Sequence, residues 1–378
     1  MNTAKSDLVA FGEDWGRHPS STQHLIKRIA VDRQVLWVNS IGMRRPRLSW
    51  HDMNRAVGKV FGNRRAPTPL TPSDTPPPGT TVTSPFVIPW PGNTAAFAAN
   101  RRLLQRQIGA RMAERGIKRP VLWTSLPTAL PVVGTLGERA VVYYCGDDFG
   151  ALAGVDHEPV LEMERRLVAK ADLILAASDV LAARFPKHKT LHVPHGADIA
   201  LFQTPANRAS DLPTDRPVAG FYGSVSSWVD VELMSAVADL MPHWWFVVIG
   251  NVETDVSALA SRPNVRLLGR RSHADLPGYA QHWMASLLPF RDNAQIRACN
   301  PLKLREYLAA GRPIIATDFP ALSPYRDLIN VATGPHTFAA ALTACTSEPD
   351  RAADRRLRVQ GETWEARVAD VERAMASL

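Results

Sequence analysis

Residues 299–313 read CNPLKLREYLAAGRP, and this stretch specifies a short helix with a signal at each end. Asn300 suits the N-cap position, because its side chain can accept a hydrogen bond from a free amide of the first turn, and Pro301 suits the first helical position. An apolar stripe at helical spacing is formed by Leu304, Tyr307 and Leu308. Gly311 suits the left-handed residue after a helix, and residues 313–317 (PIIAT) then predict a buried strand.

The polar residues of this helix indicate a function. A helix N-terminus offers free amide groups and a positive dipole end, which attract phosphate. Lys303 adds a charge in the first turn, and Glu306 lies on the same face about 4.5 Å further along the axis. A carboxylate there suits the two hydroxyls of a ribose, so the stretch predicts a nucleoside diphosphate site. The alternative is an ordinary capped helix with a solvated Lys–Glu pair.

Residues 300–313 also resemble the donor-site helix of bacterial GT-B glycosyltransferases, most closely those of the exopolysaccharide and teichuronic-acid type. The resemblance implies an α/β fold of two Rossmann-like domains, each with a doubly wound parallel sheet, facing a central cleft. It also implies that Lys303 meets the donor diphosphate and Glu306 the ribose. Asn300 and Leu302 belong to the same motif and count among the donor-binding candidates.

The resemblance and the chain order together predict the domain boundaries. Residues 1–198 are expected to form the acceptor-binding domain, and residues 199–216, stiffened by prolines, the linker. Residues 217–350 are expected to form the nucleotide-sugar domain. Residues 351–378 look helical, and GT-B chains often end in helices that cross back onto the first domain.

Further donor contacts are predicted in two loops of the second domain. Gly223 and Ser224 follow an apolar strand and can bring backbone amides close to phosphate. In the family, the turn at residues 270–277 lies against the nucleotide base, which makes Arg271 and His273 candidates. A surface turn is the alternative for both residues.

Candidate catalytic and acceptor residues lie in the first domain. The apolar strand beginning at Ala140 ends in Asp147 and Asp148, and carboxylates at a strand C-terminus suit a general base. The alternative is that both acids shape a turn. Trp15 and His18 lie in a polar loop at another strand end, where the family places the acceptor; a packed Trp and a surface His are the alternative.

Composition limits the class of protein. A chain of 378 residues with 45% hydrophobic and 21% charged residues suits two globular domains. Its three cysteines predict neither a disulfide framework nor a zinc site, and no metal or other cofactor is expected. No apolar run approaches the roughly 18 residues of a membrane span, and Asp7 interrupts any signal peptide, so we expect a cytoplasmic location.

The positive charge lies in the first half of the chain. Up to Asp198 there are 26 Lys and Arg against 17 Asp and Glu, and after it 18 against 19. Residues 43–65 have the pattern of a basic amphipathic helix, and residues 93–115 of a second basic helix. Both suit an anionic membrane surface, with a solvated basic face as the alternative. No nucleic-acid-binding motif is present.

Two features of the retaining branch of the family are missing. Position 298 is Ala where that branch has a Glu, and residues 224–230 contain no basic residue. These differences favour an inverting reaction with Asp147 as the base. The leading hypothesis is a metal-independent transferase that uses a nucleotide diphosphate sugar, with UDP-sugar as the expected donor and a glycan or lipid-linked sugar as the acceptor. The competing hypotheses are a nucleotide-sugar epimerase of the same fold and a non-catalytic membrane scaffold.

Overall fold

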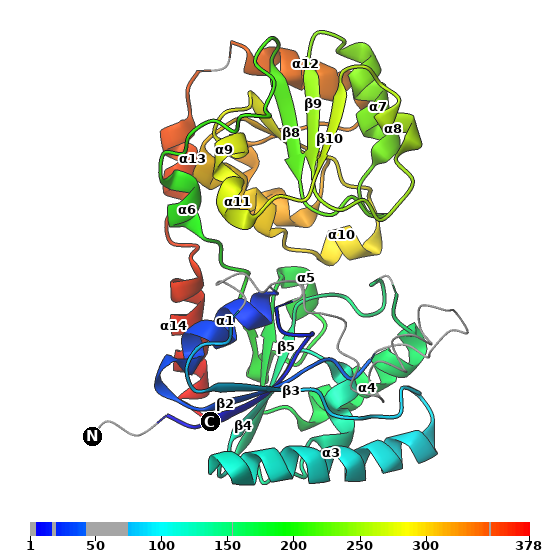
Figure 1. Cartoon of the computed structure of the whole chain (residues 1–378), viewed down its shortest axis with the longest axis vertical. Helices are drawn as coiled ribbons and strands as arrows, with labels where there is room; N and C mark the ends of the chain where they lie inside the picture. The colour runs from blue at the N-terminus through cyan, green and yellow to red at the C-terminus, as the bar shows by residue number, and fades with distance from the viewer. Residues whose placement is uncertain (1–4, 17–19, 43–74, 153, 348) are drawn as a thin grey trace. The chain divides into compact units, whose positions relative to one another are not determined.

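The computed structural model describes residues 5–16, 20–42, 75–152, 154–347 and 349–378. The chain forms two compact units, of which the first contains Met1–Pro194 with Arg367–Leu378 and the second contains His195–Ala366. Each unit is built on a parallel β-sheet with helices packed on it (Figure 1). This confirms the predicted α/β architecture of two Rossmann-like domains.

The sheet of the first unit has the described strand order β3-β2-β1-β4-β5-β6-β7, with every neighbouring pair parallel. The strands are β1 Leu8–Phe11, β2 Val35–Val38, β3 Thr80–Thr83, β4 Val121–Thr124, β5 Ala140–Cys145, β6 Leu173–Ala176 and β7 Thr190–His192. The helices are α1 Ser21–Ile29, α3 Thr94–Arg115, α4 His157–Lys170 and α5 Asp179–Ala182, with 3-10 turns at Ala30–Asp32, Pro127–Val132 and Lys187–Lys189. The central strands are continuous apolar runs because both faces of a parallel sheet are covered.

The sheet of the second unit has the described order β10-β9-β8-β11-β12-β13. The strands are β8 Val218–Tyr222, β9 Trp245–Ile249, β10 Val265–Gly269, β11 Ala285–Leu288, β12 Ile314–Ala316 and β13 Asn330–Val331. The helices are α6 Ile199–Gln203, α7 Val231–Leu240, α8 Ser257–Ala260, α9 Pro277–Ala280, α10 Ala294–Ala298, α11 Leu302–Ala310, α12 Pro335–Cys345 and α13 Ala352–Val359, with 3-10 turns at His273–Asp275 and Pro320–Leu328. Strands β8 and β11 are hydrogen-bonded neighbours, and α10 and α11 lie between β11 and β12 in the chain.

The chain passes twice between the units. Residues 199–216, expected as a linker, lie within the second unit and include α6. The last helix, α14 (Trp364–Met375), begins in the second unit and continues in the first. There Glu372 forms ion pairs with Arg33 and, at 3.6 Å, with Lys5.

Candidate functional site

Helix α11 has the predicted interior and end, but its beginning differs from the prediction. Leu304, Tyr307 and Leu308 are all fully buried, and the helix ends at Gly311 with a φ of 89°. The N-cap is Pro301, which has no side-chain capping bond, so the prediction of Asn300 as the N-cap was wrong. The Asn300 side chain instead accepts a hydrogen bond from the guanidinium of Arg305. That buried guanidinium attracts the Asn300 oxygen away from the first-turn amides.

The missing cap leaves the first turn of α11 open. Among the described residues, the backbone amides of Leu302 and Lys303 have no hydrogen-bond acceptor, whereas the amide of Leu304 donates to the carbonyl of Pro301. Leu302 and Lys303 are both half-buried, so a ligand can reach this turn. Two free amides at the positive end of a helix form an anion-binding position.

The side chain of Lys303 lies across the end of β8. Its Nζ is 5.8 Å from the centre of the Phe221 ring, and a Cβ at Gly223 would lie only 2.1 Å from its Cε. No described residue forms an ion pair with this ammonium. Desolvation by the surrounding protein lowers the pKa of Lys303, although the negative charge of Glu306 opposes this effect. A half-buried cation without an ion-pair partner favours an anionic ligand.

Glu306 is a fixed, buried carboxylate. It is 6% exposed, its Oε2 accepts from the hydroxyl of Tyr222 at 2.7 Å, and its Oε1 lies 2.8 Å from Nε2 of His273. Nδ1 of His273 lies 3.8 Å from Oδ2 of Asp198. Desolvation lowers the pKa of His273, but the hydrogen bond to Glu306 and the charges of Glu306 and Asp198 outweigh it and raise the pKa overall. The alternative of a solvated Lys303–Glu306 pair is therefore wrong for Glu306.

The other donor-binding candidates fall into two groups. Ser224 is half-buried and follows Gly223, the residue at the end of β8 that lies against the Lys303 side chain. Arg271 donates to Oδ2 of Asp211 at 2.7 Å and to the hydroxyl of Tyr279 at 3.1 Å. Through these bonds Arg271 holds Asp211 against α9, which is a structural role.

In the first unit, the two neighbouring acids after β5 have different surroundings. Oδ1 of Asp148 accepts from Arg184 at 2.6 Å and from the amide of Gly150 at 2.9 Å, so this carboxylate is engaged in an ion pair and a turn. Asp147 is exposed and is described with no such partner. Desolvation, and then the negative charges of Glu13 and Asp148, raise the pKa of Asp147.

Glu13 is a residue that the sequence analysis missed. It follows β1 as Asp147 follows β5, at the same edge of the sheet. Its Oε1 accepts from the side chains of Ser20 and, at 3.1 Å, Gln23, and desolvation followed by the charge of Asp14 raises its pKa. The signal available in the sequence was its position, directly after a strand of the same type.

The two acceptor candidates have different outcomes. Trp15 is half-buried, and its ring meets that of Trp37 edge-on at a centroid distance of 4.8 Å, with Nζ of Lys27 at 5.5 Å from it. Trp15 is therefore a packed, half-buried residue. His18 lies outside the described residues, as does the proposed basic helix at residues 43–65.

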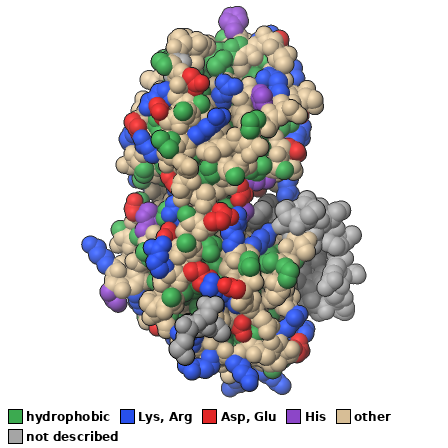
Figure 2. Space-filling model, turned by 90° about the vertical axis from the view of Figure 1, so that its left-hand side faces the viewer, with side chains coloured by type: hydrophobic (Ala, Val, Ile, Leu, Met, Phe, Trp, Pro, Cys, Tyr) green, Lys and Arg blue, Asp and Glu red, His purple; other side chains and the backbone are tan. Residues whose placement is uncertain are grey.

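The predicted second basic helix is α3. Its exposed arginines are Arg101, Arg102, Arg106, Arg111 and Arg115. Its single acid, Glu114, pairs with Arg111 at 2.8 Å. Figure 2 shows Lys and Arg side chains at the lower end of the first unit, where Figure 1 places α3. Within the described parts of the chain, no helix has both the length and the apolar composition needed to cross a bilayer.

No metal-binding cluster is found in the parts of the chain that the structure describes, when groups of three or more His, Cys, Asp or Glu are sought. Two side chains near the open turn of α11 can carry positive charge. Positive charge there is available from Lys303 and, when protonated, from His273.

Comparison with protein families finds a match within the second unit. Residues 216–348 match the family described as "Glycosyl transferases group 1". A curated relative is TuaH of Bacillus subtilis (strain 168), whose name gives it as a teichuronic acid biosynthesis glycosyltransferase; it is 28% identical over 229 residues. The aligned stretch covers 54% of this chain and 57% of that protein, so the chain spans little more than half the length of this relative.

Comparison with solved structures extends over the whole chain. HepE of Anabaena, solved with UDP and glucose, has a TM-score of 0.69 at 13% identity, covering 99% of this chain and 100% of that one. Sucrose-phosphate synthase of Thermosynechococcus elongatus has a TM-score of 0.70 at 15% identity, covering 99% of both chains. At these identities the likeness establishes the fold alone, and it confirms the predicted GT-B arrangement of two Rossmann-like units in one chain.

Proposed function

We propose that this chain, whose residues 216–348 match the group 1 glycosyltransferases and which has a GT-B fold, transfers a sugar from a nucleotide diphosphate sugar to a glycan or lipid-linked acceptor. The observation that supports this most strongly is the first turn of α11. It combines two open amides, the ammonium of Lys303, which no described residue pairs with, and the buried carboxylate of Glu306 one turn later. This set matches a diphosphate followed by a ribose.

A UDP-sugar is the proposed donor, and a cell-surface glycan the proposed product. HepE has been solved with UDP and with UDP-glucose, which supports the choice of UDP. The name of TuaH supports cell-surface glycan synthesis, for which we propose that the chain works at the cytoplasmic face of the membrane. Neither relative defines the sugar of this chain.

We assign the proton transfer to Asp147, in an inverting reaction. The acceptor hydroxyl oxygen forms a bond to the anomeric carbon while the bond from that carbon to the diphosphate oxygen breaks. Asp147 takes the hydroxyl proton, and the departing diphosphate keeps the electron pair. Lys303 and the positive end of α11 stabilise the charge that develops on the diphosphate.

The direct test is an assay with purified full-length protein, a panel of nucleotide diphosphate sugars and membrane-derived acceptors. Transfer of labelled sugar to the acceptor, with release of the nucleoside diphosphate, is the expected result, and EDTA is expected to leave the rate unchanged. An altered sugar formed without acceptor would instead establish an epimerase. Absence of nucleotide binding would contradict the donor site itself.

Replacing Asp147 by Asn is expected to lower kcat by about 100-fold or more, since a positioned general base contributes about that much. Because the pKa of Asp147 is raised, its carboxylate begins to be protonated at a higher pH than an ordinary Asp, and the acid limb of the kcat profile should lie correspondingly high. Glu13→Gln removes one of the negative charges that raise this pKa, so it should move the limb to lower pH.

A matched control for this prediction is Asp148→Asn. Asp148 is bound to Arg184 and Gly150, so its loss is expected to lower stability more than kcat. Its charge raises the pKa of Asp147 less than that of Glu13 does, so the acid limb should move to lower pH by less than in Glu13→Gln. Full activity of Asp147→Asn would remove Asp147 as the base.

We also propose that the basic first unit contacts an anionic membrane surface through α3. The triple change of Arg101, Arg102 and Arg106 to Gln should weaken binding to vesicles containing anionic lipid, at about 1 kcal/mol for each charge near the surface. Vesicle flotation at low and high salt measures this binding. Charge screening at high salt should abolish the difference between the variant and the unmodified protein. Equal binding of both proteins at low salt would contradict the proposal for α3.

A further inference from the structure

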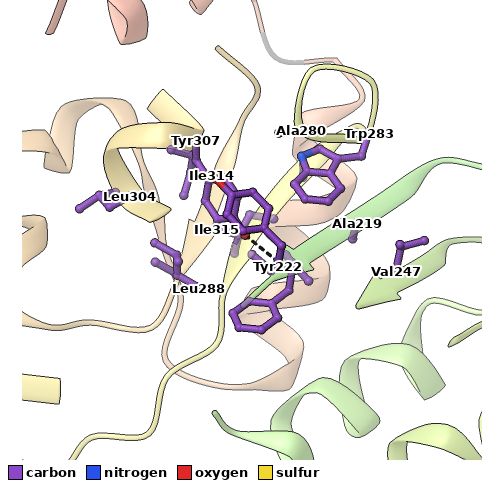
Figure 3. Packing of buried hydrophobic residues seen from close by; sticks show 14 of the residues in the cluster. Ala219, Tyr222, Val247, Ala280, Trp283, Leu288, Leu304, Tyr307, Ile314 and Ile315 are labelled. Carbon is purple, nitrogen blue, oxygen red and sulfur yellow. Dashed lines mark hydrogen bonds between the residues drawn. The ribbon is translucent and has the colours of Figure 1, made fainter. Parts of the chain in front are cut away.

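Tyr222 is the last residue of β8 and is tightly enclosed. It is 3% exposed, and its ring lies 4.8 Å from that of Tyr307 and 6.1 Å from those of Trp283 and Phe202, measured between centroids. Figure 3 shows Tyr222, Tyr307 and Trp283 gathered beside β8, with a dashed line for a hydrogen bond between residues drawn. That bond runs from the Tyr222 amide to the Tyr307 hydroxyl at 3.1 Å. Both the backbone and the ring of Tyr222 are therefore fixed.

The hydroxyl of Tyr222 has one recorded partner among the described residues, which is Oε2 of Glu306 at 2.7 Å. Ring packing alone would be satisfied by Phe, and burying a hydroxyl costs free energy unless it is hydrogen-bonded. The hydroxyl is thus explained by Glu306 and by nothing else in its described surroundings. Desolvation and the charge of Glu306 raise the pKa of Tyr222, so the phenol stays protonated and can donate throughout the neutral range.

The bond fixes a side chain that would otherwise be mobile. A Glu side chain loses about 1.5–2 kcal/mol of rotamer freedom when it is ordered. Held by Tyr222 on one oxygen and His273 on the other, Glu306 is ordered before any ligand arrives. Each carboxylate oxygen keeps a lone pair that can accept a hydrogen bond donated by a ribose hydroxyl.

We infer that Tyr222 is a positioning residue, which holds the Glu306 carboxylate in the orientation that receives the ribose hydroxyls of the donor. This inference rests on the proposed function, because it requires that the donor ribose binds at Glu306. Tyr222 itself is buried behind Glu306 and makes no contact with the donor in this scheme. Its effect is confined to the part of donor recognition that passes through Glu306.

The test compares UDP with 2′-deoxy-UDP and 3′-deoxy-UDP by calorimetry, on the full chain and on Tyr222→Phe. The unmodified protein should prefer UDP, and Tyr222→Phe should weaken UDP by about five- to tenfold while scarcely changing the deoxy analogue whose missing hydroxyl binds Glu306. In the transfer assay, the donor KM should rise and kcat should change little. A merely structural role would weaken all three nucleotides equally.

The matched control is Tyr307→Phe, which removes a hydroxyl from the same aromatic cluster without touching Glu306. It should lower the melting temperature but keep the preference for UDP over the deoxy analogues. Glu306→Gln distinguishes failure of the proposed donor site from failure of the inference about Tyr222. If Glu306→Gln keeps the full preference, the proposed donor site is wrong. If Glu306→Gln loses the preference while Tyr222→Phe retains it, the donor site stands and the inference about Tyr222 is overturned.

Discussion

Lys303→Met is expected to weaken UDP binding by about 10- to 100-fold, the range for losing a hydrogen bond to a charged group. Met keeps most of the aliphatic length that lies across Gly223 and beside Phe221, so the packing should survive. The free protein should be at least as stable as before, because a desolvated ammonium that no described residue pairs with is removed. Calorimetric titration and thermal melts with and without UDP measure both effects.

The control for Lys303→Met is Lys187→Met, which removes an exposed charge from the first unit. It should change neither the UDP affinity nor the thermal shift. UDP binding to Lys303→Met as tight as to the unmodified protein would exclude Lys303 as the diphosphate ligand.

Gly223→Ala is expected to reduce donor binding more strongly than it reduces stability. The backbone φ of 129° is strained for any residue with a Cβ, which costs about 1–3 kcal/mol. The new Cβ would also lie 2.1 Å from Cε and 2.7 Å from Nζ of Lys303. Because that side chain is flexible at its far end, the clash is relieved by moving the ammonium, which displaces the group that binds diphosphate.

A matched variant for this effect is Gly269→Ala at the end of β10. Gly269 has a positive φ of 67°, but a Cβ there would meet nothing within 4 Å. It therefore reproduces part of the backbone strain without touching Lys303. Denaturant unfolding and UDP titration of both variants separate the two costs; equal loss of UDP binding in both would show that displacement of Lys303 is unimportant.

The parts of the fold that the sequence predicted were those encoded locally. The apolar run of β5, the helical spacing of Leu304, Tyr307 and Leu308, and the position of Gly311 each depend on neighbours within a few residues. The doubly wound arrangement followed from the alternation of strands and helices along the chain and from the resemblance to GT-B glycosyltransferases. Local rules failed at Asn300, where Arg305 binds the side chain that the capping pattern had assigned to the helix amides.

The contacts that define the site are long-range, which explains why the sequence did not predict them. Tyr222 lies 84 residues before Glu306, and strand periodicity marks it only as a buried position. The bond between Arg271 and Asp211 likewise joins positions 60 residues apart. Glu13 and Asp147 influence each other because β1 and β5 end at the same edge of one sheet.

A crystal structure of the full chain with UDP tests the central claim most directly. The account predicts diphosphate oxygens at about 3 Å from the amides of Leu302 and Lys303 and from Nζ of Lys303, with ribose hydroxyls on Glu306. UDP bound elsewhere, with the first turn of α11 making no contact to phosphate, would contradict it.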